Sequence, residues 1–314
     1  MTGTLQEGTE RTFDVVGLGY TATDYLAIVP NLPEFDTKLE ATCLSIQGGG
    51  PVATGLVTAA RLGHSCSYIG KVGDDSFAEF MVAELAREGV DVRRVVCEKG
   101  AESQFAFVMV DSSSGHRTIV WTRGTVSKLR QGEAILTDID SCRCLLLDDL
   151  EVEAAIEAAL RAREAKVPIV LDAGTFREGM GKLLPLCDYI VAGREFGTQL
   201  AGTSAPLAAA RDIHDKTGNV AAITMGEEGC VCVDTDGVHR QGAFKVRAVD
   251  TTGAGDVFHG AFAVGILKGW ELPKVLEFSS AVAAMKCRRL GGRPGIPSFQ
   301  EAIGFLREHS PQNW

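Results

Sequence analysis

Apolar residues recur with two different spacings along this chain, and the change of spacing divides it into parts. A short apolar run at Phe13 to Leu18 is typical of a buried strand. Four later segments alternate apolar and polar residues in the period of a half-buried strand. They are Leu26 to Val29, Lys38 to Ile46, Gln104 to Asp111 and His116 to Trp121. Because these strands lack the crossover helices of a parallel sheet, they predict a small separate sheet.

From Cys144 onward, strand and helix patterns alternate. Strands are predicted around LLLDDL, PIVLDAG, YIVAG and VAAITMG, and residues with helical spacing lie between them. Such a βαβαβ order requires a parallel sheet with right-handed crossovers, which places the chain in the α/β class. Further helices are predicted around Ala261 to Leu267, at Leu272 to Met285 and at the terminal segment EAIGFLRE.

Two glycine-rich segments each lead into a helix pattern. The first is QGGGPVATGLVTAARLG, and the second is DTTGAGDVFHGAF, which follows a predicted strand at Val246 to Val249. Glycine lets the backbone turn sharply and lets a ligand approach closely. The first turn of a helix leaves amide N–H groups without intrahelical partners, and these groups together with the helix dipole favour an anion. The second segment therefore predicts a phosphate site at Gly253, Ala254 and Gly255.

Asp256 stands beside this predicted anion site. An aspartate at a helix start can serve for capping alone. It can also be a base that takes a proton from a hydroxyl while phosphate charge is held next to it. The segment taken by itself fits both interpretations.

Asp24 is a second candidate, and it follows a segment with an alternative interpretation. GLGYTA at 17–22 matches a loose dinucleotide-binding fingerprint, so a nicotinamide oxidoreductase has to be considered. That fingerprint should open a helix, but the next residues alternate and contain Pro30 and Pro33, which favours a strand and a turn. Asp24 lies just past the first strand, where ligands bind in open α/β sheets. Its carboxylate suits two neighbouring sugar hydroxyls, and a turn-forming aspartate is the alternative.

The length and composition of the chain limit the number of domains and the kinds of partner that it can have. The chain has 314 residues, 45% of them hydrophobic, a net charge of −10 and a pI of about 5.2. One large α/β domain with a small appendage fits this length. The acidic charge disfavours nucleic acid and anionic membranes as partners. Residues 1–12 are polar and no segment has the length of a membrane span, so neither a signal peptide nor a membrane anchor is expected.

The nine cysteines lie mostly within apolar runs and form no C-x-x-C pair. This pattern is typical of buried thiols in a cytoplasmic protein. The pairs Cys142/Cys144 and Cys230/Cys232 are expected on strands, each pair facing one side. Their spacing is wrong for a zinc site.

Several segments resemble the motifs of one family. DTTGAGDVFHGAF is similar to the C-terminal signature of the ribokinase-like (PfkB) carbohydrate kinases, and the triple-glycine helix entry ending in ARLG is similar to their N-terminal signature. GKVGDD and TMGEEGC resemble two further family elements, G-x-V-G-x-D and T-x-G-x-x-G. GGGPVAT, DVFHGA and KCRRLGGRPGIP are most similar to the branch that holds the sulfofructose kinases.

The resemblance implies a ribokinase-like α/β fold. In this fold a central, mostly parallel sheet is flanked by helices on both faces, and a small β-sheet forms a lid over the sugar site. The resemblance places the kinase domain at residues 12–308, the lid strands at about 25–46 and 104–122, and the nucleotide-binding half at about 185–308. It also implies a homodimer that pairs through the lid.

The implied activity is ATP-dependent phosphorylation of a hydroxyl of a small sugar, with a ketose or a sugar acid favoured. Asp256 would remove the proton, and the amides of Gly253, Ala254 and Gly255 would stabilise the transferred phosphoryl group. The residues implied to hold the sugar are Asp24, Gly48, Gly49, Gly50 and Thr54, the last standing where many members carry Asn. Candidates to bind an acidic group of the substrate come from the lid strands or their ends: Lys38, Arg123, Arg117 and Trp121.

The resemblance also implies where ATP and its ions bind. The ATP phosphates would be held through Thr224, Gly226 and Gly229. Glu195 would orient magnesium through water, in an N-x-x-E element whose Asn is replaced by Ala192. Carbonyl oxygens of Asp250 and Thr252, with those of the glycine-rich loop near residues 291–297, would hold a monovalent cation, usually potassium.

Two alternatives remain within this resemblance. A nucleoside kinase would share the fold and similar signatures. A catalytically silent sugar-binding regulator would keep the fold, although it would have less reason to keep Asp256 beside an intact Gly-Ala-Gly loop.

Overall fold

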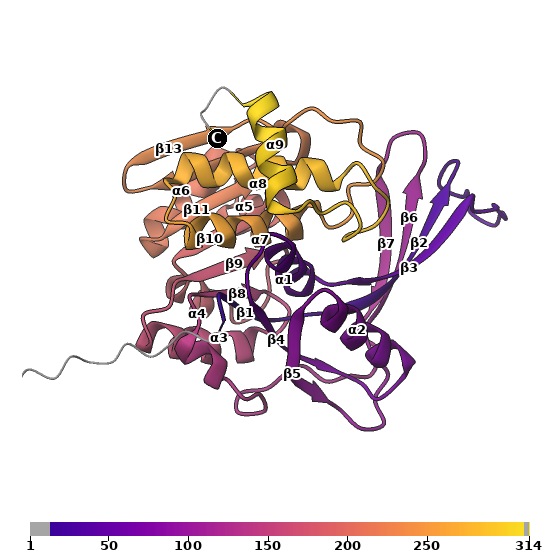
Figure 1. Cartoon of the computed structure of the whole chain (residues 1–314), viewed down its shortest axis with the longest axis horizontal. Helices are drawn as coiled ribbons and strands as arrows, with labels where there is room; N and C mark the ends of the chain where they lie inside the picture. The colour runs from indigo at the N-terminus through magenta and orange to yellow at the C-terminus, as the bar shows by residue number, and fades with distance from the viewer. Residues whose placement is uncertain (1–12, 311–313) are drawn as a thin grey trace, which may run out of the picture.

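A computed structural model describes residues 13–310 and 314, and it contains two β-sheets with helices packed around the larger one (Figure 1). The polar segment 1–12 and the predicted domain start at residue 12 lie outside the described residues. None of the described helices is long and apolar enough to cross a membrane.

The larger sheet has nine strands in the order β13-β12-β11-β10-β9-β8-β1-β4-β5. All neighbouring pairs are parallel except the two made by β12. This confirms the mostly parallel sheet expected from the sequence. Its strands are β1 (Val15–Leu18), β4 (Cys66–Val72), β5 (Val90–Cys97), β8 (Cys144–Asp148), β9 (Ile169–Ala173), β10 (Tyr189–Gly193), β11 (Val220–Thr224), β12 (Cys230–Asp234) and β13 (Gly237–Gln241).

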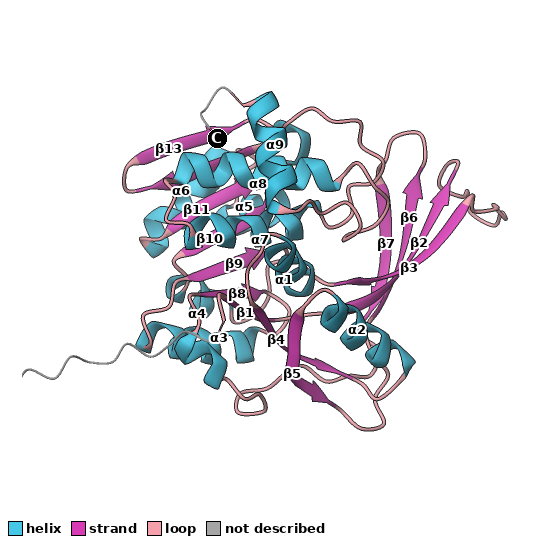
Figure 2. Ribbon diagram, viewed as in Figure 1, coloured by secondary structure: helices cyan, strands magenta, loops and turns pink. Residues whose placement is uncertain are grey.

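Helices cover both faces of this sheet, because its strands are apolar on both sides (Figure 2). One face packs against α1 (Pro51–Arg61), α7 (Ala254–Leu267), α8 (Leu272–Lys286) and α9 (Phe299–His309). The other packs against α3 (Val152–Glu164), α4 (Met180–Leu183), α5 (Arg194–Ala201) and α6 (Pro206–Thr217). Among residues 13–310, the remaining helices are α2 (Ser76–Arg87) and three 3₁₀ turns at Thr137–Ser141, Leu184–Leu186 and Gly226–Glu228.

The second sheet confirms the expected small sheet beside the larger one. Its strands are β3 (Cys43–Gly49), β2 (Ala22–Val29), β6 (Phe105–Asp111) and β7 (Arg117–Thr122), in that spatial order. The β2/β6 pair is parallel, and the other two pairs are antiparallel. Since the first element after Gly19 is β2, which begins at Ala22, no helix opens where a dinucleotide-binding enzyme needs one, and that alternative is wrong.

Three predictions of local structure need correction. The strand expected from Lys38 begins only at Cys43, because β2 ends at Val29 and the pair Ile28/Cys43 is the last in the ladder. No strand forms at 246–249 either. The end of this segment is hydrogen-bonded to the end of α8 instead. The amides of Val249 and Asp250 both donate to the carbonyl oxygen of Cys287.

The third correction concerns a cysteine pair. Cys142 follows a 3₁₀ turn and is not part of a strand, and it packs on the opposite face of the sheet from Cys144. Cys230 and Cys232 do lie on β12 and face the same side.

The order of the strands reverses at β1, and this reversal is the topological switch point at which the crevice of an open α/β sheet lies. The chain runs from β1 outward to β4 and β5, and it later resumes on the other side of β1 with β8 and β9. Ligands bind outside the carboxyl ends of the strands at such a switch point. The ends of β1, β8 and β9 therefore mark where functional side chains should be sought.

Candidate active site

The N-terminus of α7 forms the centre of the site. Gly253 is its N-cap residue and has a φ of 71°, a left-handed conformation that favours glycine. The amide of Ala254 donates to the carbonyl of Thr251 at 3.2 Å. No backbone acceptor is recorded among the described residues for the amides of Gly253 and Gly255. Two of the three predicted amides are thus free to bind an anion.

Buried hydrogen bonds hold the loop before α7 in place. The carboxylate of Asp250 is fully buried and accepts from the amide and hydroxyl of Thr252 at 2.8 and 2.7 Å. Its other oxygen accepts from the amide of Gly291 at 2.7 Å. Asp250 therefore joins the loop to the glycine-rich segment that follows α8.

Asp24 on β2 lies in the same region as Asp256. Burial raises the pKa of Asp24 to about 7, the Arg293 guanidinium lowers it, and the carboxylate of Asp256 raises it further. A side chain on Gly49 would collide with the Asp24 carboxylate, since an added Cβ would lie 2.1 Å from Oδ2. The glycine run thus leaves the space in which Asp24 stands.

Asp256 lies in the first turn of α7 and is half-buried. Burial raises its pKa, while the charges of His259, Arg117, Lys286 and Arg293 oppose that rise. Three of these cationic groups come from other elements of the chain. A carboxylate with a raised pKa among cations is well placed to accept a proton from a bound hydroxyl.

Further carboxylates end the neighbouring strands. Asp148 at the end of β8 accepts from the amides of Tyr20 and Leu150 at 2.7 and 3.0 Å, and burial raises its pKa to about 7. Asp172 at the end of β9 lies with its Oδ2 3.1 Å from Nδ1 of His259, and burial raises its pKa. The charges of Asp256 and Asp148 also raise the pKa of Asp172, so these acids lie near one another.

Comparison with known proteins identifies the chain. A model of the pfkB family of carbohydrate kinases matches residues 12–298. The chain belongs to the PfkB family. It is 31% identical to a ribokinase of Haemophilus influenzae over 305 residues, covering 93% of this chain and 98% of that protein. It is also 24% identical to a mouse ketohexokinase, covering 90% of this chain and 98% of that protein.

A solved structure confirms the fold. The structure of Arabidopsis thaliana ribokinase complexed with ribose and ATP is 22% identical, and it superposes with a TM-score of 0.79. The match covers 94% of this chain and 99% of that chain. The protein is therefore a carbohydrate kinase with the ribokinase-like α/β fold.

Arg293 is a residue of this kinase that the sequence interpretation missed. It is 3% exposed, its Nη2 donates to the carbonyl of Gly49 at 2.9 Å, and its Nε lies 3.4 Å from the hydroxyl of Thr54. Its Nη1 is buried without a recorded partner among the described residues and lies against Gly48. The signal in the sequence was an arginine inside the glycine-rich run GGRPG, where a loop serving only as a turn has no need of one.

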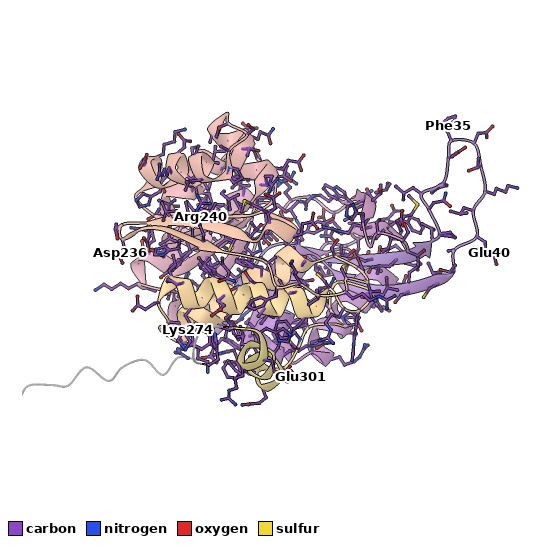
Figure 3. The ribbon with its side chains drawn as sticks, turned by 90° about the horizontal axis from the view of Figure 1, so that it is seen from above. Phe35, Glu40, Asp236, Arg240, Lys274 and Glu301 are labelled. Atoms are coloured by element: carbon purple, nitrogen blue, oxygen red, sulfur yellow. The ribbon has the colours of Figure 1, made fainter. Side chains whose placement is uncertain are left out.

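The basic residues predicted to bind an acidic substrate group lie in three different environments. Lys38 is exposed in the loop between β2 and β3, which projects away from the molecule at Phe35 and Glu40 (Figure 3). Arg123 pairs with the buried Glu151 at 2.6 Å. Arg117 alone reaches the α7 loop, where its Nη1 donates to the hydroxyl of Thr251 at 2.9 Å. The structure does not bring Lys38 to the crevice, and Arg123 is engaged elsewhere.

Thr54 and Trp121, which were both predicted to contact the substrate, contact other side chains of the protein. The Thr54 side chain is 1% exposed, and the recorded contact of its hydroxyl is with Arg293. Trp121 on β7 is half exposed and packs edge-on against Tyr20. The replacement of the family's Asn by Thr54 therefore comes with an arginine beside it.

The predicted nucleotide residues meet at the ends of β10 and β11. Gly193 and Thr224 are paired in the sheet, and Glu195 follows two residues later, exposed in the first turn of α5. Gly226 and Gly229 bound the turn after β11, both with positive φ. His259 links this side to α7, since its Nε2 lies 2.9 Å from the carbonyl of Val191 on β10. His259 thus connects the strand before the predicted nucleotide residues to the helix that carries Asp256.

The expected monovalent cation does not fit the residues present. The carbonyl oxygens of Asp250 and Thr252, which the resemblance assigns to potassium, both accept hydrogen bonds from the ammonium of Lys286. A side chain of this chain already supplies a cation there. The predicted potassium site is incompatible with these contacts.

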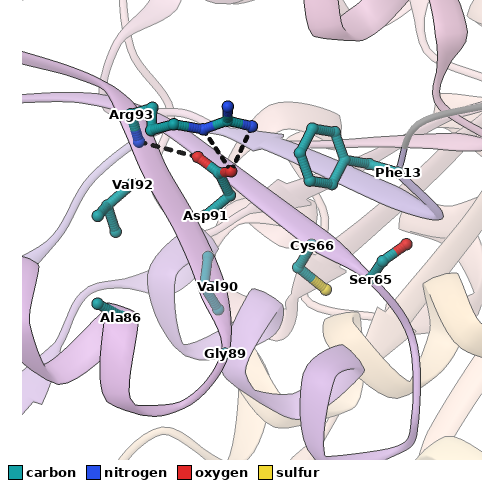
Figure 4. A pocket seen from close by; sticks show the side chains of 9 residues that line it. All are labelled: Phe13, Ser65, Cys66, Ala86, Gly89, Val90, Asp91, Val92 and Arg93. Carbon is teal, nitrogen blue, oxygen red and sulfur yellow. Dashed lines mark hydrogen bonds and ion pairs between the residues drawn. The ribbon is translucent and has the colours of Figure 1, made fainter.

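A pocket elsewhere on the kinase contains none of the predicted site residues. It has a volume of about 390 Å³ and lies beside β5, lined in part by Phe13, Cys66 and Val90 (Figure 4). Its charged residues neutralise each other, because Arg93 donates to Asp91 at 2.7 Å. The pocket offers no unpaired charge for catalysis.

Proposed function

We propose that this kinase transfers the terminal phosphoryl group of ATP to a hydroxyl of a small sugar, with Asp256 as the base. The observation that supports this most is the placement of Asp256 at the start of α7. There Asp256 adjoins the unpaired amides of Gly253 and Gly255, and its charge raises the pKa of Asp24. Base, anion site and sugar-binding carboxylate then belong to one crevice.

Each group has a defined part in the proposed reaction. Asp24 accepts hydrogen bonds from two sugar hydroxyls and orients the ring. Asp256 accepts the proton of the attacking hydroxyl, and the amides of Gly253 and Gly255 stabilise charge on the phosphoryl group as it passes. Little covalent chemistry is required of the protein, because phosphoryl transfer depends mostly on positioning and electrostatic stabilisation.

Magnesium fits this proposal as an ion held mainly by ATP. Within the described part of the chain, no cluster of three or more acidic, histidine or cysteine side chains forms a metal cage. Magnesium is usually bound through phosphates, waters and one or two carboxylates, and the exposed Glu195 suits such a water-mediated contact. When bound, magnesium would neutralise charge on the phosphates.

Two arginines support a sugar acid as the substrate. Arg293 has a buried Nη1 without a recorded protein partner in the described residues, and Arg117 reaches the α7 loop from the lid. Guanidinium groups recognise carboxylates well. These two residues therefore replace Lys38 and Arg123 as the proposed contacts for an acidic substrate group.

The nine free cysteines support a reducing compartment for the enzyme. All but Cys43 and Cys97 are buried, and none forms a disulfide. We therefore propose the cytoplasm as its location.

The variant Asp256→Asn tests the proposed base. It removes the proton acceptor but keeps the size of the side chain, so turnover should fall by roughly 10²–10⁴ while ATP still binds. The measurement is ADP release with the best acceptor, beside calorimetric titration of ATP. The control is Asp236→Asn, an exposed aspartate in the turn of β12 and β13 (Figure 3). Unchanged turnover in Asp256→Asn would rule out the role.

An acceptor panel tests the substrate class and the alternatives. It should contain aldopentoses, ketohexoses, sugar acids and nucleosides, each measured by ADP release. Highest kcat/KM with a ketose or a sugar acid supports the proposal. A preference for nucleosides would make the protein a nucleoside kinase. ATP binding without transfer to any acceptor would favour a silent sugar-binding regulator.

A further inference from the structure

Lys286 is a buried cation that the proposed reaction does not use directly. It is the last residue of α8, and its side chain is 0% exposed. Moving a charge out of water costs several kcal/mol unless polar groups compensate. The groups that compensate should therefore reveal what the charge does.

Those groups are the backbone carbonyls of the loop before α7. Nζ of Lys286 donates to the carbonyl oxygen of Asp250 at 3.0 Å and also to that of Thr252. The two carbonyls flank Thr251, immediately before the N-cap Gly253. Lys286 thus fixes the segment whose next amides form the anion site.

The same lysine lies where two segments meet. The loop after α8 passes close to its backbone, since a Cβ on Gly295 would lie 2.2 Å from the carbonyl oxygen of Lys286. Asp250 ties this loop to the α7 loop through the amide of Gly291. The ammonium of Lys286 therefore binds the two carbonyls of the α7 loop at which the sequence led us to expect a potassium ion, and its backbone lies against the loop after α8.

We propose that the ammonium of Lys286 replaces the monovalent cation, so that this kinase holds its phosphate-binding loop in its active shape without potassium. This inference rests on the proposed kinase function for its activity readout. It reverses the expectation of a potassium-dependent enzyme.

The physical reason is that both ions satisfy the same carbonyls. An ammonium group and a potassium ion carry the same charge and have similar sizes, and each binds the negative ends of carbonyl dipoles. Two carbonyls that point at one place repel each other unless a cation lies between them. A tethered ammonium belongs to the chain, whereas a free ion must be bound from solution.

Lys286 also acts on the base electrostatically. Its charge is one of the four that counter the burial of Asp256 and lower the pKa of that carboxyl. Removal of the charge should therefore loosen the conformation of the loop before α7 and raise the pKa of Asp256. Lys286 is a positioning residue, since it is buried and its ammonium contacts the loop.

The first test uses the unmodified enzyme in different salts. Turnover and the ATP-induced rise in Tm are measured in KCl, NaCl and choline chloride at one ionic strength of about 0.1 M, which equalises screening. We expect each quantity to differ by no more than about twofold between the three salts, because the chain itself supplies the cation. A larger activation by KCl over choline chloride would overturn the proposal.

The second test compares two substitutions of the lysine. Lys286→Ser leaves room for an ion, so turnover should fall on the order of tenfold or more in choline chloride and recover substantially in KCl. Lys286→Met fills the space without a charge, so turnover should fall without recovery. Lys182→Ser, which removes an exposed lysine from α4, is the matched control and should respond to no cation.

The outcomes separate this inference from the proposed function. Full turnover of Lys286→Ser in choline chloride, or a loss that KCl leaves unchanged, would contradict the role of Lys286. If Lys286→Ser fails to fold, the salt series on the unmodified enzyme decides alone. If no acceptor is phosphorylated, the kinase proposal fails, and the ATP-induced Tm shifts in the different salts still test the built-in cation.

Discussion

Asp24 illustrates the cost of placing a functional carboxylate in a crevice. Its ordinary pKa of 3.8 rises to about 7, chiefly through burial. Because the folded protein binds this proton more tightly than the unfolded chain, the contribution to stability is fully present below about pH 3.8. It is lost as the pH rises through about 7. Above that pH the charged carboxylate destabilises the free enzyme.

The variant Asp24→Asn should therefore stabilise the free kinase more at pH 8 than at pH 5. The difference in the free energy of unfolding between variant and wild type should grow by at most about 3 kcal/mol over this range, since one pKa unit corresponds to about 1.36 kcal/mol. The measurement is urea unfolding at both pH values, with Asp236→Asn as the exposed control. An equal difference at pH 5 and pH 8 would show that Asp24 does not titrate in this window. Sugar binding should weaken at the same time, because Asn accepts fewer hydrogen bonds.

At the scale of single residues, the sequence predicted the acids of the site better than its cations. Asp256 stands in a family signature, and Asp24 stands just past the first strand, so each could be proposed from its place in the sequence. Arg293 and Lys286 lie far along the chain from the groups that they contact, Gly49 and the carbonyl of Asp250 respectively. No local pattern reports such contacts, because they arise only when α8 and the following loop pack against α1 and α7.

At the scale of elements, the crossing of α1 and α7 holds the start of α7 in place. The two helices pack closely in the core beneath the crevice. A Cβ on Gly260 would lie 2.3 Å from the carbonyl oxygen of Gly55 and 2.8 Å from Cβ of Thr58. The absence of a side chain at Gly260 therefore permits the helices to approach.

The variant Gly260→Ala should lower the free energy of unfolding by about 1–3 kcal/mol, because the overpacking outweighs the gain of about 1 kcal/mol in helix propensity. Thermal and urea unfolding measure this change. Gly304→Ala on α9 is the matched control, since a Cβ there meets no atom within 4 Å. That control should be neutral or stabilising. Equal effects of both substitutions would contradict the close crossing.

Element boundaries were less predictable than element types. The period of the apolar residues identified the strands of both sheets and most helices. It failed at residues 38–42 and 246–249, where apolar residues alternate but no neighbouring strand is available for pairing. A strand requires a partner, and the partner is set by the tertiary structure and not by the local sequence.

At the scale of the whole molecule, the two faces of the lid sheet differ. Asp24 and Leu26 on β2 lie on the same face as Val108 on β6, and that face is turned toward the crevice and the core. The opposite face carries cross-strand rows of apolar residues at Ile46, Tyr25, Phe107 and Val120, and at Leu44, Ala27 and Met109. α2 covers one end of it, where Phe77 stacks on Phe105. Much of the rest is exposed, with Val120 at 62% and Leu44 at 61%.

We predict that this exposed face pairs with the same face of a second copy, because a flat apolar sheet face can be self-complementary about a two-fold axis. Val120→Asp and Leu44→Asp should each convert a dimer to a monomer, since burial of an unpaired carboxylate in the interface is costly. Light scattering at micromolar concentration measures the mass. Val238→Asp, at a position 39% exposed on β13 of the other sheet, should leave the dimer intact. A monomeric wild type, or variants that remain dimeric, would refute pairing through the lid. Since the opposite side of the same sheet carries Asp24, pairing would also restrain the strand that we propose to bind the sugar.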